Sequence, residues 1–544
     1  MIRRPVRPWG VVAVAVAVLV VGAAAGVVLI RGFSVKDAIR AIAPGRSVTI
    51  PVSGGAHLAA ELIAPKGSGP FPLLVMPAAW GAGASQYAIV GARLAADGYL
   101  VVAYAQRGFG GSTGLIDFAG SATVSDVGSV ISWALANARV QPSQVGVLGI
   151  SYGAGVSLLA AANDPRIKAV VAMSAWADLA GALYPNRTVS IQALAALDEA
   201  ATTAGTPDGD VRRLGTDFAD HQGAAGVALL EAMSPSRSAV TDVTAINKNH
   251  TAVMIANGFE DSIFPPSQLI SFFDQLSTPK RMQLAAGDHT GPEAAGVLGQ
   301  PDPTWDDAIA WLDHYLRGKA NGIELAAPVQ LRDVTTGVVH GYPDWASVGQ
   351  AGGYGIGPGS SDQLIGPPGT ATGSAGASSN WTVAIAGGTD TIADAGTPNY
   401  SPTSTYRAPS GVRIASIPTA DAAVWSGPAL GKATMVSGAP SLHLRIAASA
   451  GSASVFCYLY DVDGSGLGTL MSFEPYTVPE ATTTSAQPVT IALQPTSWTV
   501  PAGHHLALVI DTVDPRYLSL STTTDHITLS STSADPARFS VPTS

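Results

Sequence analysis

A serine between two glycines, placed where a strand-like run gives way to a helix-forming run, most constrains this chain. Residues 145–150 form a short, mostly apolar run that leads into the motif Gly149-Ile150-Ser151-Tyr152-Gly153. Residues 154–162, which come next, are rich in alanine and leucine. A strand-to-helix turn this tight strains the serine backbone, and glycines two residues on either side give the turn steric room. The stretch therefore predicts a nucleophile elbow with Ser151 exposed at its tip.

A second copy of the same pattern surrounds Ser112, in the run Gly110-Gly111-Ser112-Thr113-Gly114. Glycine is common in this chain, with 60 among 544 residues, so a chance copy is expected. The Ser112 copy follows a strand but runs into residues 115–118 with no helix start. We therefore expect Ser112 to lie in a glycine-rich loop rather than at a nucleophilic turn.

The composition excludes some classes of protein. The net charge is −10 and only 12% of residues are charged, which excludes the basic footprint of a nucleic-acid-binding protein. A single cysteine, Cys457, excludes an internal disulfide and sits in a strand-like run, so a buried structural thiol is expected. The segment Asp461-Val462-Asp463-Gly464 lacks the downstream glutamate of a calcium loop, and a plain β-turn is expected there.

The N-terminus carries an uncharged apolar run over residues 11–30, preceded by Arg3, Arg4 and Arg7 and closed by Arg31. Twenty such residues can span a bilayer, and basic residues before them favour keeping that end in the cytoplasm. Small residues at 22–26 could instead serve a signal peptidase. We expect residues 1–46 to form a membrane anchor or signal segment with a spacer, the uncleaved anchor being favoured, and the rest of the chain to be exported.

The body of the chain changes character twice. Near-continuous apolar strands alternate with helices over residues 47–325, which predicts an α/β domain with a mostly parallel sheet buried on both faces. About residues 176–245 interrupt this pattern with helical stretches only, which predicts a helical cap over the strand ends. Short strands at turn-punctuated spacing then fill residues 326–544, which predicts an all-β sandwich of the jelly-roll kind.

The chemistry of a serine nucleophile calls for two further groups in a set order. A serine hydroxyl needs a base, normally histidine, and the base needs an acid that fixes its tautomer. In this fold the order along the chain is serine, acid, histidine. Asp261 follows a predicted strand that ends at Ala256, and His289 follows the next strand. Glu260 is the rival acid, but it is expected to point away. We predict a triad of Ser151, Asp261 and His289.

An acyl-transfer site also needs two donors for the oxyanion. The backbone N–H of Tyr152 supplies one by construction of the elbow. The second should come from the loop of residues 77–83, where Trp80 is the candidate through its backbone or its indole N–H. The alternative is that Trp80 only walls the pocket.

With the triad and the domain order in view, the chain resembles the acyl hydrolases grouped with cocaine esterase and X-prolyl dipeptidyl-peptidase. The resemblance runs from about Ser47 to the C-terminus and implies an α/β-hydrolase core, a helical cap and a jelly roll beside the active site. The residues that carry it are residues 149–153, Arg107-Gly108, Gly258 to Asp261, the histidine loop, Trp311 to Gly318 and Trp498 to His504.

Three positions depart from the pattern of that family. Ala105 stands where family members commonly have aspartate, so Arg107 must find another partner. The cocaine-esterase branch uses a tyrosine hydroxyl as second oxyanion donor, where this chain offers Ala79 or Trp80. Branches that bind a free α-ammonium have acidic residues shortly after the catalytic aspartate, whereas here Ser262-Ile263-Phe264 follows. The last departure weakens an aminopeptidase function.

The sequence thus predicts a serine hydrolase that cleaves small-molecule carboxylic esters through an acyl-enzyme, with no metal or organic cofactor. Trp176, Tyr184 and Phe264 are expected to line an apolar substrate pocket. Two alternatives stay open: an X-prolyl dipeptidyl-peptidase or other amide-cleaving acylase, and a catalytically inactive cell-surface binding protein. The cap could supply a carboxylate for an ammonium group from Asp217, Asp220 or Glu231. Oligomeric state is not encoded in any readable pattern.

Overall fold

The structure is a computed structural model that describes residues 45–219, 223–356, 364–365, 380–396, 410–449, 452–479 and 485–543. The apolar run at 11–30, predicted as an anchor or signal segment, lies outside these residues. Within them, no helix combines the length and the apolar character needed to cross a bilayer.

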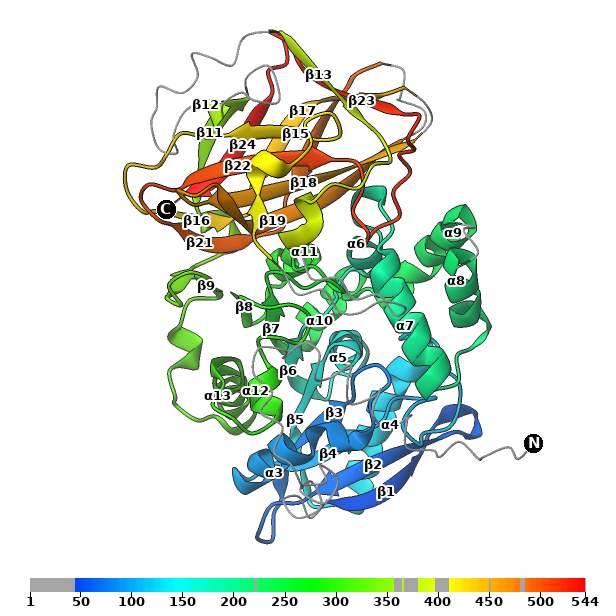
Figure 1. The fold of residues 1–544 in the computed structure, drawn as a ribbon. Coiled ribbons are helices and arrows are strands. Elements are labelled where there is room, and N and C mark those ends of the chain that lie inside the picture. The colour runs from blue at the N-terminus through cyan, green and yellow to red at the C-terminus, as the bar shows by residue number, and fades with distance from the viewer. Residues whose placement is uncertain are drawn as a thin grey trace, which may run out of the picture.

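A ten-stranded sheet runs through the lower half of the molecule in Figure 1. Its strand order is β1-β2-β4-β3-β5-β6-β7-β8-β9-β10, with parallel pairing from β4 through β9 and antiparallel pairing at both edges. The strands are β1 (Arg46–Pro51), β2 (His57–Ile63), β3 (Phe71–Pro77), β4 (Leu100–Tyr104), β5 (Val140–Ile150), β6 (Ile167–Met173), β7 (Ala252–Gly258), β8 (Lys280–Ala285), β9 (Val329–Arg332) and β10 (Val339–Tyr342).

Helices cover both faces of this sheet, because its strands are apolar on both sides. In β3, Leu73 and Val75 join the core on one face, whereas Leu74 and Met76 join the core on the other. This confirms the predicted mixed α/β sheet buried on two faces. The first core is covered by α4 (Ser121–Asn137), α5 (Tyr152–Asn163) and α11 (Ser267–Gln275), and the second by α3 (Ala88–Ala96) and α13 (Pro303–Arg317).

The chain between β6 and β7 is helical in the part that the structure describes. It contains α6 (Leu179–Leu183), α7 (Ile191–Ala204), α8 (Gly209–Ala219), α9 (Gly223–Met233) and α10 (Val243–Asn249). Figure 1 shows α7, α8 and α9 standing beside the strand layer and below the upper domain. This is the segment for which the sequence predicts a cap.

Two antiparallel sheets make up the C-terminal part and enclose a core of their own. Cys457 lies in that core as a buried free cysteine. The larger sheet contains β11 (Gln350–Ile356), β12 (Leu364–Ile365), β13 (Trp381–Ala386), β16 (Thr434–Gly438), β17 (Ser441–Ala448), β20 (Gln487–Ala492), β21 (Thr496–Val500), β23 (His526–Ser531) and β24 (Arg538–Thr543). The smaller sheet contains β14 (Val412–Arg413), β15 (Ala423–Ser426), β18 (Ala453–Val462), β19 (Leu467–Val478) and β22 (His505–Asp511).

The α/β sheet extends beyond residue 325, the residue at which the sequence predicts the end of the α/β domain. Strands β9 and β10 add to it after the last helix, so the sheet ends at Tyr342. The shift in composition after Pro328 marks the end of the helices, but two strands of the first sheet still follow. The turn at Asp463 joins β18 to β19, and Asp463 Oδ1 accepts from the backbone N–H groups of Ser465 and Leu467.

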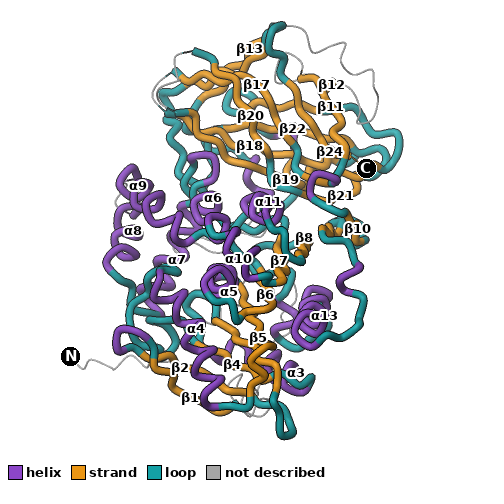
Figure 2. Tube along the Cα trace, turned by 180° about the vertical axis from the view of Figure 1, so that it is seen from behind, coloured by secondary structure: helices purple, strands orange, loops and turns teal. Residues whose placement is uncertain are grey.

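The sandwich is seated on the α/β part through polar contacts of β19 and its neighbours. Asn186 Nδ2 donates to Glu474 Oε1 at 2.7 Å, and the hydroxyls of Thr188 and Thr477 are 2.8 Å apart. Gln494 Nε2 donates to Glu474 Oε2 at 2.6 Å and to Ser267 Oγ at 2.9 Å. Figure 2 shows α6 and α11 below the sandwich from behind.

Candidate active site

The turn at Ser151 has the strain that its sequence predicts. Ser151 sits between β5 and α5 with φ 56° and ψ −121°. A Cβ on Gly149 would lie 2.2 Å from the carbonyl carbon of Gly153, and a Cβ on Gly153 would lie 2.1 Å from the carbonyl oxygen of Pro77. Real Cβ atoms do not approach so closely, so both positions require glycine. The turn thereby presents the serine hydroxyl at the carboxyl end of β5.

The structure brings Ser151, His289 and Asp261 into one hydrogen-bonded chain. Ser151 Oγ lies 2.7 Å from His289 Nε2, and His289 Nδ1 lies 2.9 Å from Asp261 Oδ2 and 3.0 Å from Oδ1. The three residues follow β5, β8 and β7, whose carboxyl ends share one edge of the parallel sheet. The Asp261 side chain is 0% exposed and that of His289 is 11% exposed. The geometry suits transfer of a proton from serine to histidine.

Asp261 is held in place by its own loop. The backbone N–H groups of Ile263 and Phe264 donate to Oδ1 at 3.0 and 2.7 Å, and Asn257 Nδ2 donates to Oδ2 at 3.2 Å. These donors fix the plane of the carboxylate before the histidine is considered. Asp261 can therefore orient the imidazole and stabilise its protonated form.

Opposing effects act on the pKa of His289. Burial is the largest single effect and lowers it, whereas the charge and the hydrogen bond of Asp261 and the charges of Asp288 and Glu293 raise it. The net result is a pKa above the usual value. A more basic imidazole is a better acceptor for the serine proton.

Glu260, the rival acid, points elsewhere. Its Oε2 accepts from the backbone N–H of Gly287 at 2.7 Å, and burial raises its pKa to about 7. A Cβ on Gly258 would lie only 2.0 Å from the carbonyl oxygen of Gly287, so the loops of the acid and the histidine run in close contact. Glu260 fastens these loops together and does not contact the imidazole.

Hydrogen bonding distinguishes the two candidate oxyanion donors of Trp80, its indole N–H and its backbone N–H. The indole Nε1 of Trp80 donates to the carbonyl of Leu197 at 2.9 Å, so the indole is occupied by the cap. The backbone N–H groups of Trp80 and Tyr152 have no acceptor among the residues that the structure describes. Of the two donors considered for Trp80, the backbone N–H is therefore the one left for an oxyanion.

An aromatic row surrounds the elbow and includes two of the three predicted pocket residues. Trp176 stacks on Tyr152 with ring centroids 5.9 Å apart and lies 5.1 Å from Phe264, and the rings of Phe264 and His289 form a T-shaped pair at 5.3 Å. Trp80 meets Tyr152 edge-on at 4.7 Å. Tyr184, the third predicted pocket residue, follows α6 and packs against the core, and no hydrogen bond or ring contact joins it to the triad in the described part.

A small apolar pocket lies beside Trp80 and beneath the cap helices α7 and α8. Its only charged lining residue is Asp198, and burial raises the pKa of that carboxyl. The sequence offered no signal for Asp198, because it is one of two acidic residues in an ordinary amphipathic helix. The pocket lining is Trp80, Phe118, Leu194, Leu197, Asp198, Val211, Leu214 and Gly215.

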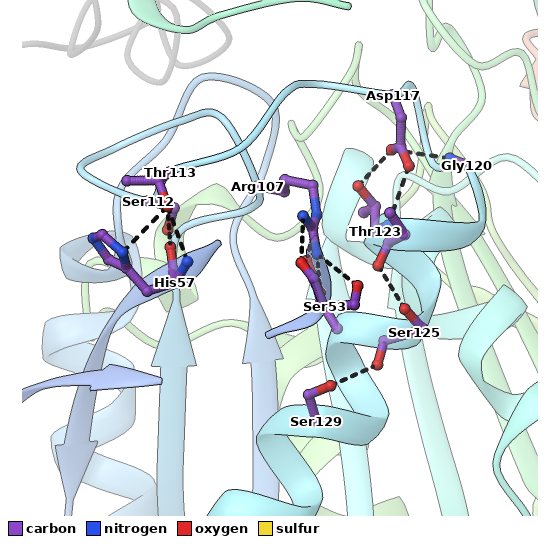
Figure 3. A network of polar contacts seen from close by, with 12 residues as sticks. Ser53, His57, Arg107, Ser112, Thr113, Asp117, Gly120, Thr123, Ser125 and Ser129 are labelled. Carbon is purple, nitrogen blue, oxygen red and sulfur yellow. Dashed lines mark hydrogen bonds and ion pairs between the residues drawn. The ribbon is translucent and has the colours of Figure 1, made fainter. Parts of the chain in front are cut away.

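Arg107 finds its partner on α4. Its Nε and Nη2 donate to the two carboxylate oxygens of Asp126 at 3.0 and 2.6 Å, and it also contacts Ser53 (Figure 3). Burial raises the pKa of Asp126 to about 6, against the lowering effect of Arg107. The sequence signal was a lone aspartate on the apolar face of α4, which carries Val127 and Val130. Asp126 thus pairs with Arg107 in a chain that has Ala105 where family members commonly have aspartate.

Ser112 has a structural role. Its hydroxyl donates to the carbonyl of Ala105 at 2.7 Å and accepts from the backbone N–H of Ala59 at 2.9 Å, and Figure 3 shows it beside His57 and Thr113. The described residues include no cluster of side chains suited to a metal ion.

The fold and the site define a serine hydrolase, and comparisons with known proteins give its family. Residues 54–291 match the family model of the X-Pro dipeptidyl-peptidase (S15 family), and residues 321–540 match that of the X-Pro dipeptidyl-peptidase C-terminal non-catalytic domain. The chain belongs to this family of acyl hydrolases, which also contains cocaine esterase, and it is an enzyme with hydrolase activity. The resemblance seen in the sequence is thus confirmed.

Solved structures share the fold over nearly the whole length. A CocE/NonD family hydrolase from Staphylococcus aureus is 13% identical, with TM-score 0.68 over 92% of this chain and 93% of that one. An aminopeptidase from a marine-sediment Thaumarchaeota archaeon is 16% identical, with TM-score 0.69 over 96% and 99%. An α-amino acid ester hydrolase is 15% identical, with TM-score 0.66 over 96% and 100%. At these identities the likeness shows the fold alone.

A curated relative aligns over a shorter stretch. The quorum-quenching protein AidA of Acinetobacter baumannii (strain MDR-ZJ06) is 30% identical over 120 residues, which are 21% of this chain and 39% of AidA. The chain therefore matches well under half of that relative's length.

Proposed function

We propose that this enzyme is an acyl esterase that forms an acyl-enzyme on Ser151. The observation that carries the proposal is the unbroken chain from Ser151 Oγ through His289 to the buried carboxylate of Asp261. Tyr152 and Trp80 supply the two oxyanion N–H groups.

The reaction follows from these positions. Ser151 Oγ attacks the ester carbonyl while its proton passes to His289 Nε2, and Asp261 stabilises the resulting imidazolium through Nδ1–H. The oxyanion of the tetrahedral intermediate accepts from the backbone N–H groups of Tyr152 and Trp80. The imidazolium then gives its proton to the departing alcohol. A water molecule, deprotonated by the same histidine, releases the acid.

Esters with neutral acyl groups fit the surroundings best. The carboxylates beside the segment after Asp261 already accept hydrogen bonds from its backbone. The N–H of Ser262 donates to Asp288, and the N–H groups of Ile263 and Phe264 donate to Asp261. Trp176 and Phe264 add aromatic walls. A buried substrate ammonium would need a carboxylate of its own, because its desolvation costs several kcal/mol.

An X-Pro dipeptidyl-peptidase is the second candidate, favoured by the description of the matched family. Its ammonium partner would be Asp198, which lines the pocket beside Trp80 and has no side-chain hydrogen bond within the described part of the chain. This carboxylate lies at a position for which the sequence predicted no role.

Steady-state kinetics on p-nitrophenyl esters of rising acyl length and on an X-Pro-p-nitroanilide separates the two candidates. We expect kcat/KM for the best ester to exceed that for the anilide, and Asp198→Asn to leave ester turnover within about threefold of wild type. A higher kcat/KM for the anilide, with a raised KM in Asp198→Asn, would replace the esterase by the dipeptidyl-peptidase.

We also propose that the enzyme acts outside the cytoplasm, tethered by residues 11–30 or released if that segment is cleaved. The apolar length of the segment and the arginines before it support this placement. Fractionation of cells that express the full chain, beside a chain that starts at Gly45, tests it. Recovery of the full chain in the cytoplasmic fraction would refute the proposal.

A further inference from the structure

We propose that Glu293 is a positioning residue for the reaction: it holds the His289 turn through Ser174 and Thr290 and adds its negative charge to the field at the imidazole. The inference rests on the triad proposed above. It concerns a residue that is not hydrogen-bonded to any of the three triad members.

A chain of hydrogen bonds links Glu293 to the turn that carries the histidine. Ser174 Oγ donates to Glu293 Oε1 at 2.7 Å and accepts from the backbone N–H of Thr290 at 3.0 Å. Thr290 is the residue directly after His289. The position of the Glu293 carboxylate is therefore coupled, through the Ser174 hydroxyl, to the backbone beside the imidazole.

Both residues joined by this chain have strained backbones. Ser174 has φ 49° and Thr290 has φ 64°, a region that costs a non-glycine residue roughly 1–3 kcal/mol. A β-branched threonine is especially disfavoured there. Such conformations persist only where the surroundings hold them, and the Ser174 hydroxyl is the group that contacts Thr290.

Ser174 also connects the histidine turn to the elbow. It follows β6, and its backbone N–H donates to the carbonyl of Ala256 at 2.7 Å. The neighbouring Met173 carbonyl accepts from the backbone N–H of Ser151 at 2.8 Å. One short segment thus contacts the nucleophile on one side and the histidine turn on the other.

The burial of Glu293 calls for an explanation. Its side chain is 0% exposed, and Oε2 has no hydrogen-bond partner in the part of the chain that the structure describes. The backbone is anchored independently, because its carbonyl accepts from Trp305 Nε1 at 3.0 Å. A buried carboxyl with an unsatisfied oxygen costs stability, and an alanine or a glutamine would avoid the buried charge.

The charge of Glu293 acts on the histidine. Burial raises the pKa of Glu293 to about 7 and the charge of His289 lowers it, whereas the charge of Glu293 raises the pKa of His289, so the protonation states of the two groups are coupled. The other titratable groups facing Glu293 are Asp261 and Tyr87, the latter hydrogen-bonded to Pro77 and Ile150. An ionised Glu293 favours the imidazolium and thereby makes His289 a stronger base.

The test is the pH profile of kcat/KM for Glu293→Gln, with Glu474→Gln as the matched control. Glutamine keeps the acceptor for Ser174 but removes the charge, so the acid limb should move to lower pH by up to about 1 unit. Glu474 is also buried and has a raised pKa, but it lies at the contact between the sandwich and the α/β part, so its variant should keep the wild-type limb. An unmoved limb in Glu293→Gln overturns the charge effect.

Two further variants test the mechanical link. Glu293→Ala and Ser174→Ala should each lower kcat at least tenfold with KM within about twofold, and the double variant should be no worse than either single. Wild-type kcat in Ser174→Ala, or additive losses in the double variant, overturns the link. Ser174→Ala also decides the matter if Glu293 variants fail to fold.

Covalent labelling keeps the two proposals apart. If a fluorophosphonate labels Ser151 in the wild type and the Glu293 variants behave as the wild type does, only this inference fails. If the folded wild type is not labelled at Ser151, the proposed triad fails first.

Discussion

Asp261 and Glu260 are neighbours in the chain, but the turn after β7 directs their side chains to different partners. Asp261 contacts His289 Nδ1, and Glu260 contacts the backbone of Gly287. The contact between Asp261 and the histidine agrees with the prediction made from the place of Asp261 after a strand. The role of Glu260 was not predictable, because it depends on a backbone approach at Gly258 that no local pattern encodes.

Asp261→Asn is expected to lower kcat about 10⁴-fold, because an amide stabilises the wrong tautomer of His289. Glu260→Gln is the matched control, since glutamine still accepts from Gly287, and it should retain activity within about tenfold. The measurement is kcat on a p-nitrophenyl ester with circular dichroism on both variants. Near-normal turnover in Asp261→Asn would assign the acid to another carboxylate.

In the proposed mechanism, the raised pKa of His289 sets the acidic limit of activity. The base must be neutral to accept the serine proton, so activity is lost as pH falls through this pKa. Because Asp261 raises the pKa above the usual value, the acid limb of kcat/KM should lie above pH 6.5. A limb below that value would show that burial outweighs the carboxylate.

The contact between Ser174 and Glu293 could not be predicted from the sequence. Their contact joins positions 119 residues apart, and neither belongs to a motif. Arg107 shows an intermediate case: the need for a partner was predictable, but its identity on α4 required the packing of the helix.

At the scale of elements, the sheet was the most predictable part. Its central strands are apolar on both faces and are separated by helices, which leaves few alternatives to a parallel sheet. Strands β9 and β10 were harder to predict, because each has only four residues and neither is fully buried, and β10 is the edge strand of the sheet. The elbow combined both signals, a buried strand and two glycines that its close contacts require.

Gly153→Ala tests those contacts. Its Cβ would meet the Pro77 carbonyl oxygen at 2.1 Å, so either α5 or the end of β3 must move, and the loop that contains Trp80, the proposed oxyanion donor, follows β3 directly. We expect the free energy of unfolding to fall by about 2 kcal/mol or more, together with a large loss of kcat. Gly209→Ala, with no atom within 4 Å of its Cβ, is the control. Equal stability and turnover in both variants would show that the elbow tolerates a side chain.

At the scale of the whole molecule, the order of the parts was predictable but their seating was not. Short strands with frequent turns predicted a β-rich C-terminal part, which the structure confirms. The contact that seats it joins Asn186 to Glu474, which are 288 residues apart, through polar side chains without a sequence pattern.

Glu474 makes this contact pH-dependent. Burial raises its pKa to about 8, despite hydrogen bonds from Gln494 and Asn186 that lower it. The folded state therefore holds a proton that the unfolded chain releases near its ordinary value of 4.5, and the contribution to stability falls as pH rises from there through about 8. Glu474→Gln should remove this dependence, so that the variant gains stability relative to wild type between pH 5 and about 8 in urea unfolding. Parallel stability curves for the two proteins would contradict the buried, protonated glutamate.

The central claim is that Ser151, activated by His289 and Asp261, is the nucleophile, and covalent labelling tests it most directly. Fluorophosphonate treatment followed by peptide mass spectrometry should find the adduct on Ser151 in the wild type and in Ser112→Ala, whose hydroxyl only bonds Ala105 and Ala59. Labelling should be absent in Ser151→Ala and strongly slowed in His289→Ala. An adduct on Ser112, or no adduct on folded wild-type protein, would contradict the account.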